Sequence, residues 1–282
     1  MARNLMIMAA GVSSRMRRSA EIDGASDATA KEALSKPKMM LSVGGRPFLD
    51  YLLFNAREAG YSDILFVINE KDDTVRNYYT ENADDEKFSG LTFSFVNQTI
   101  SKGRSKPLGT ADAVLSGLEA RRDWAGQKFT VCNSDNLYSV GALTALRLDD
   151  HLMALIDYER DALGVEQERV NAFAVIWKNK DGFITDIVEK PNVGQVEKAA
   201  DENGRVGVSM NIFRLDYNFI IPLLRETPLH PERDEKELTE TVRMLVRQKP
   251  DGMFTISLSE AVPDLTTLGD IEKVDSFISP NC

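Results

Sequence analysis

The sequence predicts an α/β fold in which a mostly parallel sheet is covered by helices on both faces. Short apolar runs, typical of buried strands, alternate with helix-like apolar periods through the first half of the chain. A helix that connects two parallel strands of one sheet packs against a face of that sheet. The 282 residues can bury a sizeable core. Because the composition does not shift sharply at any point, we expect one domain over 1–282 with two lobes, 1–150 and 151–282.

The expected elements follow from apolar spacing. The strands predicted in the first half are Leu5–Ala9, Asp63–Ile68, Leu91–Val96 and Lys128–Cys132. The helices predicted there span Phe48–Ala56, with a stop at Gly60, and Thr110–Arg121. In the second half we expect strands at 172–177, 183–188, 206–213 and 253–258, and helices at 217–225, 235–247 and 270–277. Short connections between the later strands indicate a mixed extension of the sheet.

Composition excludes several classes of function. A net charge of −10 and a pI near 4.9 argue against a nucleic-acid or an anionic membrane partner, because both require a basic surface. The two cysteines build no disulfide framework, and the two histidines lack the spacing of metal ligands. No apolar run approaches the length of a membrane span, and the start lacks a signal-peptide core. We therefore expect a cytoplasmic protein.

The turn after the first strand is rich in small residues. Such residues let the backbone approach a bulky group, and successive N–H groups in the turn form a concave site for an anion. Arg15 closes the turn and adds a cation with bidentate reach toward phosphate oxygens. Ligands of open α/β sheets bind beyond the carboxyl ends of the strands, where this turn falls. The residues expected to face a nucleotide here are Ala9, Ala10, Gly11, Ser13 and Ser14.

Residues 17–36 are small, polar and weakly patterned. Their composition predicts little burial of apolar surface, and hence a mobile segment in the free protein. A lid over the neighbouring site and a passive surface loop both remain open as interpretations.

Five segments, in order along the chain, resemble the motifs of the sugar-1-phosphate nucleotidyltransferases. They are Lys36–Pro47 with its Pro-Lys pair, Pro107–Val114, Asn133–Asp135, Val188–Pro191 and Pro263–Thr267. The resemblance extends from Leu5 to about Phe277. It implies the Rossmann-like fold of nucleotide-diphospho-sugar transferases, an NTP-binding lobe over 1–150 and an acceptor-binding lobe over 151–282. Because the chain ends soon after its last predicted helix, we expect no attached acyltransferase or β-helix domain.

The resemblance also implies the catalytic groups. Arg15 and Lys38 are expected to face the triphosphate, and Asp135 and Asp264 to bind Mg²⁺. Taken alone, each aspartate has a plainer interpretation as the cap of a following helix. Thr266 replaces the usual glycine of the last motif, which weakens the match at Asp264.

Further residues are implied on the nucleotide and acceptor sides. Leu108–Ala111 resembles the turn that binds base and ribose, and Gln98 lies where relatives place a glutamine against a pyrimidine. Thr99–Lys106 lengthens the usual spacing between these two features. Ser209 stands at the position of the family's asparagine and Asn211 at that of its glycine. The residues implied for the nucleotide are Gln98, Gly109 and Thr110, and those for the acceptor are Asn136, Glu189, Lys190, Ser209 and Asn211.

The implied reaction joins an NTP to a sugar 1-phosphate and releases pyrophosphate. A sugar phosphate is already an anionic nucleophile, so positioning, cations and a divalent metal supply most of the rate. Two alternatives stay open: a cytidylyltransferase for a non-sugar phosphate such as phosphocholine, and a regulatory paralogue that binds nucleotide sugar without turnover. The sequence identifies neither the base nor the sugar, and it leaves a homo-oligomer open.

Overall fold

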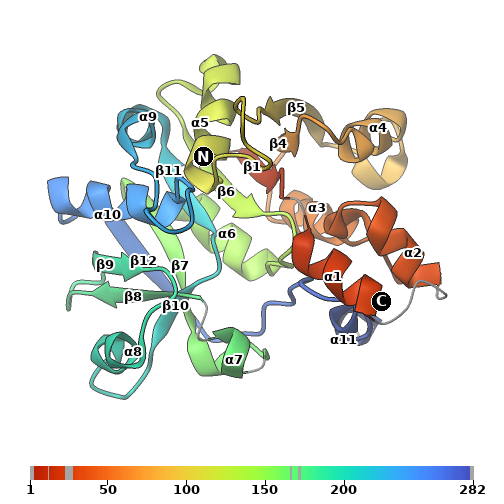
Figure 1. Cartoon of the computed structure of the whole chain (residues 1–282). Helices are drawn as coiled ribbons and strands as arrows, with labels where there is room; N and C mark the ends of the chain where they lie inside the picture. The colour runs from red at the N-terminus through yellow and green to blue at the C-terminus, as the bar shows by residue number, and fades with distance from the viewer. Residues whose placement is uncertain (1–2, 12, 23–27, 166, 171–172, 280–282) are drawn as a thin grey trace.

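The computed structural model describes residues 3–11, 13–22, 28–165, 167–170 and 173–279 (Figure 1). Val12, 23–27 and Ala172, which belong to segments interpreted above, lie outside these residues. Most described strands belong to one sheet that runs through both halves of the chain, in the order β5-β4-β1-β6-β11-β7-β10-β8-β9, and β12 pairs with β7. The predicted α/β class is confirmed.

The first half of the sheet is parallel. Its strands are β1 (Asn4–Ala9), β4 (Asp63–Asn69), β5 (Thr92–Gln98) and β6 (Lys128–Asn133). β1 lies between β4 and β6, with Met8 opposite Asn133. The four carboxyl ends therefore reach the same edge of the sheet, as the alternation of strands and helices predicts.

The second half of the sheet is mixed. Its strands are β7 (Met153–Glu159), β8 (Ala174–Lys178), β9 (Ile184–Val188), β10 (Gly207–Ser209), β11 (Phe213–Asp216) and β12 (Met253–Leu258). β11 runs antiparallel to both β6 and β7 and thereby joins the two halves. Two further short strands, β2 (Ser42–Val43) and β3 (Arg46–Pro47), form a separate hairpin.

Helices cover both faces of the sheet and bury two apolar clusters. One cluster includes Leu52 and Leu146, the other Val114 and Leu245. The helices with side chains in the first cluster are α1 (Ser14–Ile22), α2 (Ala28–Ser35), α3 (Phe48–Glu58), α4 (Thr74–Glu81), α6 (Val140–Leu148) and α11 (Gly269–Ile278). Those with side chains in the second are α5 (Thr110–Ala120), α9 (Tyr217–Glu226) and α10 (Leu238–Gln248). Two short helices remain, α7 (Gln167–Val170) and α8 (Val193–Ala199). Among the described residues, no helix is long and apolar enough to cross a membrane.

The predicted strand over 206–213 is wrong in one respect, because it is two strands. β10 ends at Ser209 and β11 begins at Phe213, and Asn211 between them has a φ of 56°. A positive φ interrupts the extended backbone, and asparagine tolerates it better than most residues.

β7 and α6 were not predicted. Ser139, a residue type typical of helix starts, caps α6 by accepting a hydrogen bond from Ala142 N at 2.9 Å.

Residues 17–36 differ most from expectation. The structure places much of this segment in α1 and α2, which lie side by side, with the C-terminal α11 close to α1 (Figure 1). Met16 and Ala20 of α1 and Ala30 and Ala33 of α2 are buried in the first cluster. The small residues that suggested a polar loop thus form the buried sides of two short helices.

Candidate active site

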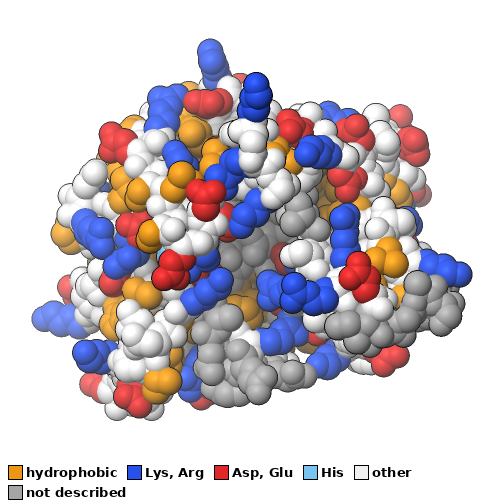
Figure 2. Space-filling model, viewed as in Figure 1, with side chains coloured by type: hydrophobic (Ala, Val, Ile, Leu, Met, Phe, Trp, Pro, Cys, Tyr) orange, Lys and Arg blue, Asp and Glu red, His pale blue; other side chains and the backbone are white. Residues whose placement is uncertain are grey.

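A cavity of about 300 Å³ opens at the carboxyl ends of β1 and β6. It lies between the turn after β1, the start of α5 and the loop that follows β6. Lys and Arg side chains gather around the hollow in the middle of the face that Figure 2 shows, although the whole chain carries a net charge of −10. The predicted residues that line the cavity are Ala10, Gly11, Ser13, Ser14, Arg15, Lys38, Gln98, Gly109, Thr110 and Asp135.

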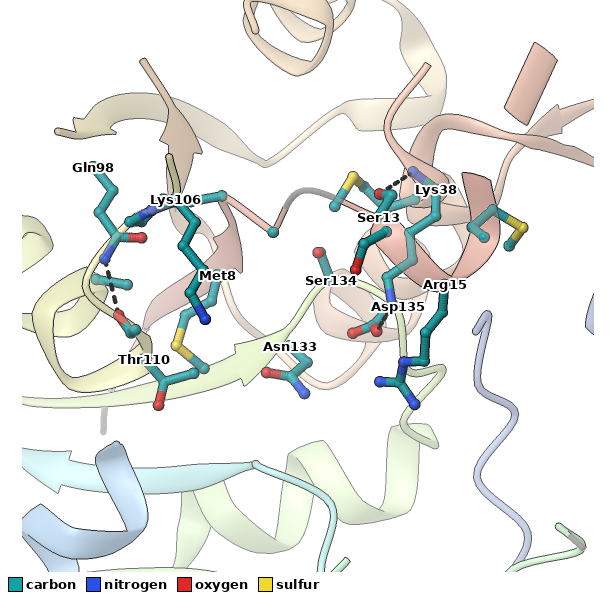
Figure 3. Close-up of a pocket in the computed structure, with 18 of the residues that line it drawn as sticks. Met8, Ser13, Arg15, Lys38, Gln98, Lys106, Thr110, Asn133, Ser134 and Asp135 are labelled. Carbon is teal, nitrogen blue, oxygen red and sulfur yellow. Dashed lines mark hydrogen bonds and ion pairs between the residues drawn. The ribbon is translucent and has the colours of Figure 1, made fainter. Parts of the chain in front are cut away.

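One end of the cavity holds Arg15, Lys38 and Asp135 (Figure 3). Lys38 begins the short 3-10 helix Lys38–Met40, and its ammonium group forms an ion pair with the Asp135 carboxylate. The Lys38 backbone N–H donates to Ser13 Oγ at 3.1 Å, and Ser13 has a φ of 51° in the turn after β1. Arg15 lies beside this pair on the first turn of α1. Three segments that are distant in sequence therefore bring two cations and one carboxylate together.

The other end holds Gln98, Gly109 and Thr110. Gln98 Nε2 donates to the Gly109 carbonyl at 2.9 Å and to Asp112 Oδ2 at 2.8 Å. Both amide hydrogens are therefore used within the protein, which leaves the side-chain oxygen of Gln98 as an acceptor. The two hydrogen bonds hold β5 against the start of α5.

Gly109 lets a second loop approach this end of the cavity. Its φ is 113°, and a Cβ there would lie 2.6 Å from the Lys236 carbonyl oxygen. Ala111 N donates to that same oxygen at 3.0 Å, and Lys236 N donates to the Leu108 carbonyl at 2.5 Å. This extended pairing explains why α10 begins at Leu238 and not at Glu235 as predicted.

Ion pairs strengthen the junction between these two loops. Lys106 pairs with Glu235, and Arg104 pairs with Asp234 at 2.5 Å. Lys106 and Glu235 also line the cavity, and the sequence analysis assigned neither a role. The position of Lys106 directly before the Pro-Leu-Gly-Thr motif is the one signal that could have indicated it.

Asp264 is close to Asp135 but does not line the cavity. Leu265 N donates to the Asp135 carbonyl at 2.9 Å, and Asp264 forms a β-bridge with Asn136. Burial and the neighbouring Asp135 carboxylate raise the pKa of Asp264 above its ordinary range. Arg169 of α7, which the sequence analysis missed, donates to Asp264 at 2.6 Å and to Asp270 at 2.6 Å. Each of the two predicted metal ligands is thus neutralised by a cation of the chain.

A hydrogen-bonded chain links the loop after β6 to the turn between β10 and β11. Asn136 is buried with its Oδ1 3.4 Å from Tyr138 Oη, and that hydroxyl donates its one hydrogen to the Met210 carbonyl at 2.7 Å. Asn211 N in turn donates to Ser209 Oγ at 3.2 Å. These contacts bring three predicted acceptor residues, Asn136, Ser209 and Asn211, to one region, outside the residues that line the cavity.

Glu189 and Lys190 follow β9 and do not line the cavity either. Glu189 is half-buried, and its pKa is raised to about 7 by burial and by the nearby Glu237 carboxylate, against the opposing effect of Arg233 and Lys190. Lys190 is exposed, with a φ of 49°. Glu189 is therefore partly protonated at neutral pH.

Two observations concern residues away from the cavity. Ala9 is buried in β1 and contributes to a different cavity behind the turn.

Asp149, Asp150 and His151 form a cluster of residue types that can bind a metal ion, but the cluster lies just before β7. Asp149 already pairs with Arg214 at 2.6 Å and with His151 at 2.9 Å, so this cluster is held by its own contacts.

The fold is of the α/β class, with a cavity that carries Arg15 and Lys38 at the carboxyl ends of its parallel strands. The chain belongs to the nucleotidyl transferase family, whose match covers residues 33–271.

Individual relatives are distant. The bifunctional protein GlmU of Methanococcus vannielii is 23% identical over 248 residues, which are 88% of this chain and 51% of the relative. The UTP–glucose-1-phosphate uridylyltransferase AglF of Haloferax volcanii is 22% identical over 188 residues, 66% of this chain and 64% of the relative. The chain thus spans about half the length of the first relative.

Solved structures share the fold. A UDP-glucose pyrophosphorylase complexed with UDP-glucose superimposes with a TM-score of 0.72 at 19% identity, over 100% of both chains. A UDP-glucose pyrophosphorylase from Acinetobacter baumanii gives 0.67 at 20% identity, over 98% of this chain and 92% of the other. The predicted nucleotide-diphospho-sugar transferase fold is confirmed.

Proposed function

We propose that the protein joins an NTP to a sugar 1-phosphate and releases pyrophosphate. The observation that carries this proposal is the pairing of Lys38 with Asp135 beside Arg15, at one end of a cavity whose other end holds Gln98 and Thr110. Phosphate groups suit the end with Arg15 and Lys38, and a base and ribose suit the end with Gln98 and Thr110, where Lys106 is paired with Glu235.

In the proposed reaction, an oxygen of the sugar phosphate forms a bond to the α-phosphorus of the NTP. The bond from that phosphorus to the oxygen bridging toward the β-phosphate breaks, and its electron pair leaves with pyrophosphate. The nucleophile carries no proton that must be removed at neutral pH, so no general base is required. Arg15 and Lys38 hold the phosphates and offset the negative charge that builds up during transfer.

Asp135 and Asp264 are the residues that would hold Mg²⁺. Their chemistry fits such an ion, because carboxylate oxygens are the ligands that Mg²⁺ prefers and the Asn136–Asp264 bridge brings the two segments side by side. When bound, the ion would neutralise charge on the phosphates. Without the ion, Lys38 pairs with the Asp135 carboxylate and Arg169 with that of Asp264.

The acceptor is proposed to lie against the second lobe. Asn136, Ser209 and Asn211 gather around the turn between β10 and β11, and Glu189 and Lys190 follow β9. Glu189 has a carboxylate that accepts from sugar hydroxyls when ionised, and Lys190 carries a charge suited to the sugar phosphate.

UTP and glucose 1-phosphate are the first pair to assay, since the name of the Haloferax volcanii relative contains both. The test in the reverse direction supplies UDP-glucose and pyrophosphate and measures UTP. Formation of UTP supports the proposal. A protein that binds UDP-glucose but forms no UTP with any divalent metal behaves as the regulatory alternative. Activity on CDP-choline alone identifies the non-sugar alternative.

A further inference from the structure

A second cavity, of about 400 Å³, lies behind the turn that follows β1. It shares Gly11 and Ser13 with the active-site cavity, so the two cavities adjoin. Its walls come from α1, from the residues before Lys38, from the β4–α4 connection and from the lengthened loop after β5. The proposed reaction assigns no role to Arg17, Lys71 or Ser105, which line this cavity.

Two cations face this cavity without a partner of their own. Arg17 of α1 and Lys71 of the β4–α4 connection both line it, and neither side chain forms an ion pair within the described part of the chain. The carboxylate of Asp72 also lines it. Asp72 Oδ1, however, accepts from Thr74 N at 2.9 Å and from Thr74 Oγ1 at 2.6 Å, which directs it to the start of α4. The cavity therefore keeps an excess of positive charge in an acidic protein.

The remaining lining supplies hydrogen-bonding groups. Hydroxyl groups come from Ser13 and Ser105, which lie on separate segments, while the Ser35 hydroxyl already donates to the Glu32 carbonyl at 3.1 Å. Asn69 Nδ2 donates to the Ala10 carbonyl at 3.2 Å, and this contact holds the shared turn against the end of β4. Cations, hydroxyl groups and a turn with small residues are the groups that bind phosphate oxygens.

We propose that this second cavity binds a small phosphate anion through Arg17 and Lys71. Inorganic phosphate and pyrophosphate share the required chemistry, a compact group with several charged oxygens. Binding of either anion requires no turnover, so this inference stands or falls separately from the proposed reaction. Arg17 and Lys71 lie outside the motifs named above, although Pro37 of the Pro-Lys pair also lines the cavity.

The test measures anion binding by calorimetry in EDTA at constant ionic strength. An Arg15→Ala/Lys38→Ala protein removes the two cations at one end of the active-site cavity, where Lys106 at the other end is paired with Glu235, and serves as the background. We expect this protein to bind one anion per chain, and we expect the added changes Arg17→Ala and Lys71→Ala to raise Kd at least tenfold. Separate titrations with inorganic phosphate and with pyrophosphate show which anion binds more tightly.

Arg18→Ala in the same background is the matched control. Arg18 is the next residue of α1, is also exposed and does not line the cavity, so its loss should leave Kd within twofold. The proposal is overturned if the background protein binds neither anion, if Arg17→Ala/Lys71→Ala leaves Kd unchanged, or if Arg18→Ala weakens binding equally. Thermal unfolding checks that each variant is folded, which we expect because Arg17, Arg18 and Lys71 are exposed.

Discussion

Lys38 donates a hydrogen bond to the carboxylate of Asp135, although 97 residues separate the two in sequence. Lys38 follows Pro37, and Asp135 comes two residues after the end of β6. The Lys38 backbone is also tied to Ser13, so the contact joins three segments at the carboxyl edge of the sheet. An ammonium group held in this way is already positioned for a phosphate that enters the cavity.

Lys38→Ala should lower kcat by about 100-fold or more, the usual effect of removing a preorganised charge from a reacting centre. Steady-state kinetics with saturating NTP and acceptor measure this loss. Lys36→Ala is the control, because Lys36 pairs on the surface with Glu32, one helical turn away. Equal kcat values for a folded Lys38→Ala variant and the wild type would refute the role of Lys38.

Asp135→Asn should raise the Mg²⁺ concentration needed for half-maximal rate by tenfold or more. The substitution keeps the shape of the side chain and removes the charge that binds the ion. Asp150→Asn is the control, since Asp150 is 98% exposed in the acidic cluster before β7. A wild-type enzyme that turns over fully in excess EDTA would contradict the metal assignment.

Gly109→Ala should separate the loop over 228–237 from the start of α5. The added Cβ would lie 2.6 Å from the Lys236 carbonyl oxygen, at a φ of 113°. Gly103→Ala is the control, because Gly103 has a φ of 88° and an added Cβ there would have no heavy atom within 4 Å. It measures the cost of a positive φ alone, about 1 kcal/mol. We expect Gly109→Ala to lower the free energy of unfolding more than Gly103→Ala and to raise the KM for NTP. Equal urea-unfolding curves and equal KM values for the two variants would argue against this packing.

Glu189 should make acceptor binding depend on pH. Its pKa is raised from 4.5 to about 7, so the folded protein binds more protons than the unfolded chain between these values. The contribution of Glu189 to the free energy of unfolding therefore falls as pH rises from 4.5 to about 7, and it is constant above pH 7. The ionised carboxylate is the better acceptor for sugar hydroxyls, so we expect the KM for sugar 1-phosphate to fall as pH rises through about 7.

Glu189→Gln should remove this part of the pH dependence. Sugar phosphates themselves titrate near pH ~6, so the informative quantity is the difference between the wild-type and variant profiles. Parallel profiles across the neutral range would show that Glu189 does not contact the acceptor.

The sequence was sufficient for the parts of the fold that depend on local pattern. The apolar run before Ala9 and the one before Asn133 predicted β1 and β6, and strand alternation placed their ends together. Lys38 and Asp135 could then be expected at one edge of the sheet. Their ion pair is a tertiary contact that no local pattern encodes.

Other features depended on contacts with distant segments. Met16 and Ala20 form an apolar side of α1 only because α2 and the neighbouring core cover it. Glu235 lies in an extended segment and not in α10 because Lys236 pairs with the turn at Leu108. Asn211 takes the left-handed backbone conformation at the position where the family has glycine, which splits the expected strand.

Release of pyrophosphate from an NTP in the presence of a sugar 1-phosphate tests the central claim most directly. A coupled assay with each of the common NTPs, several sugar 1-phosphates and Mg²⁺ would measure it, with Lys38→Ala as the inactive reference. We predict release that requires both substrates, together with an equal amount of nucleotide sugar identified by mass spectrometry. Release without an acceptor, or no release from any pair by folded protein that binds NTP, would contradict the account.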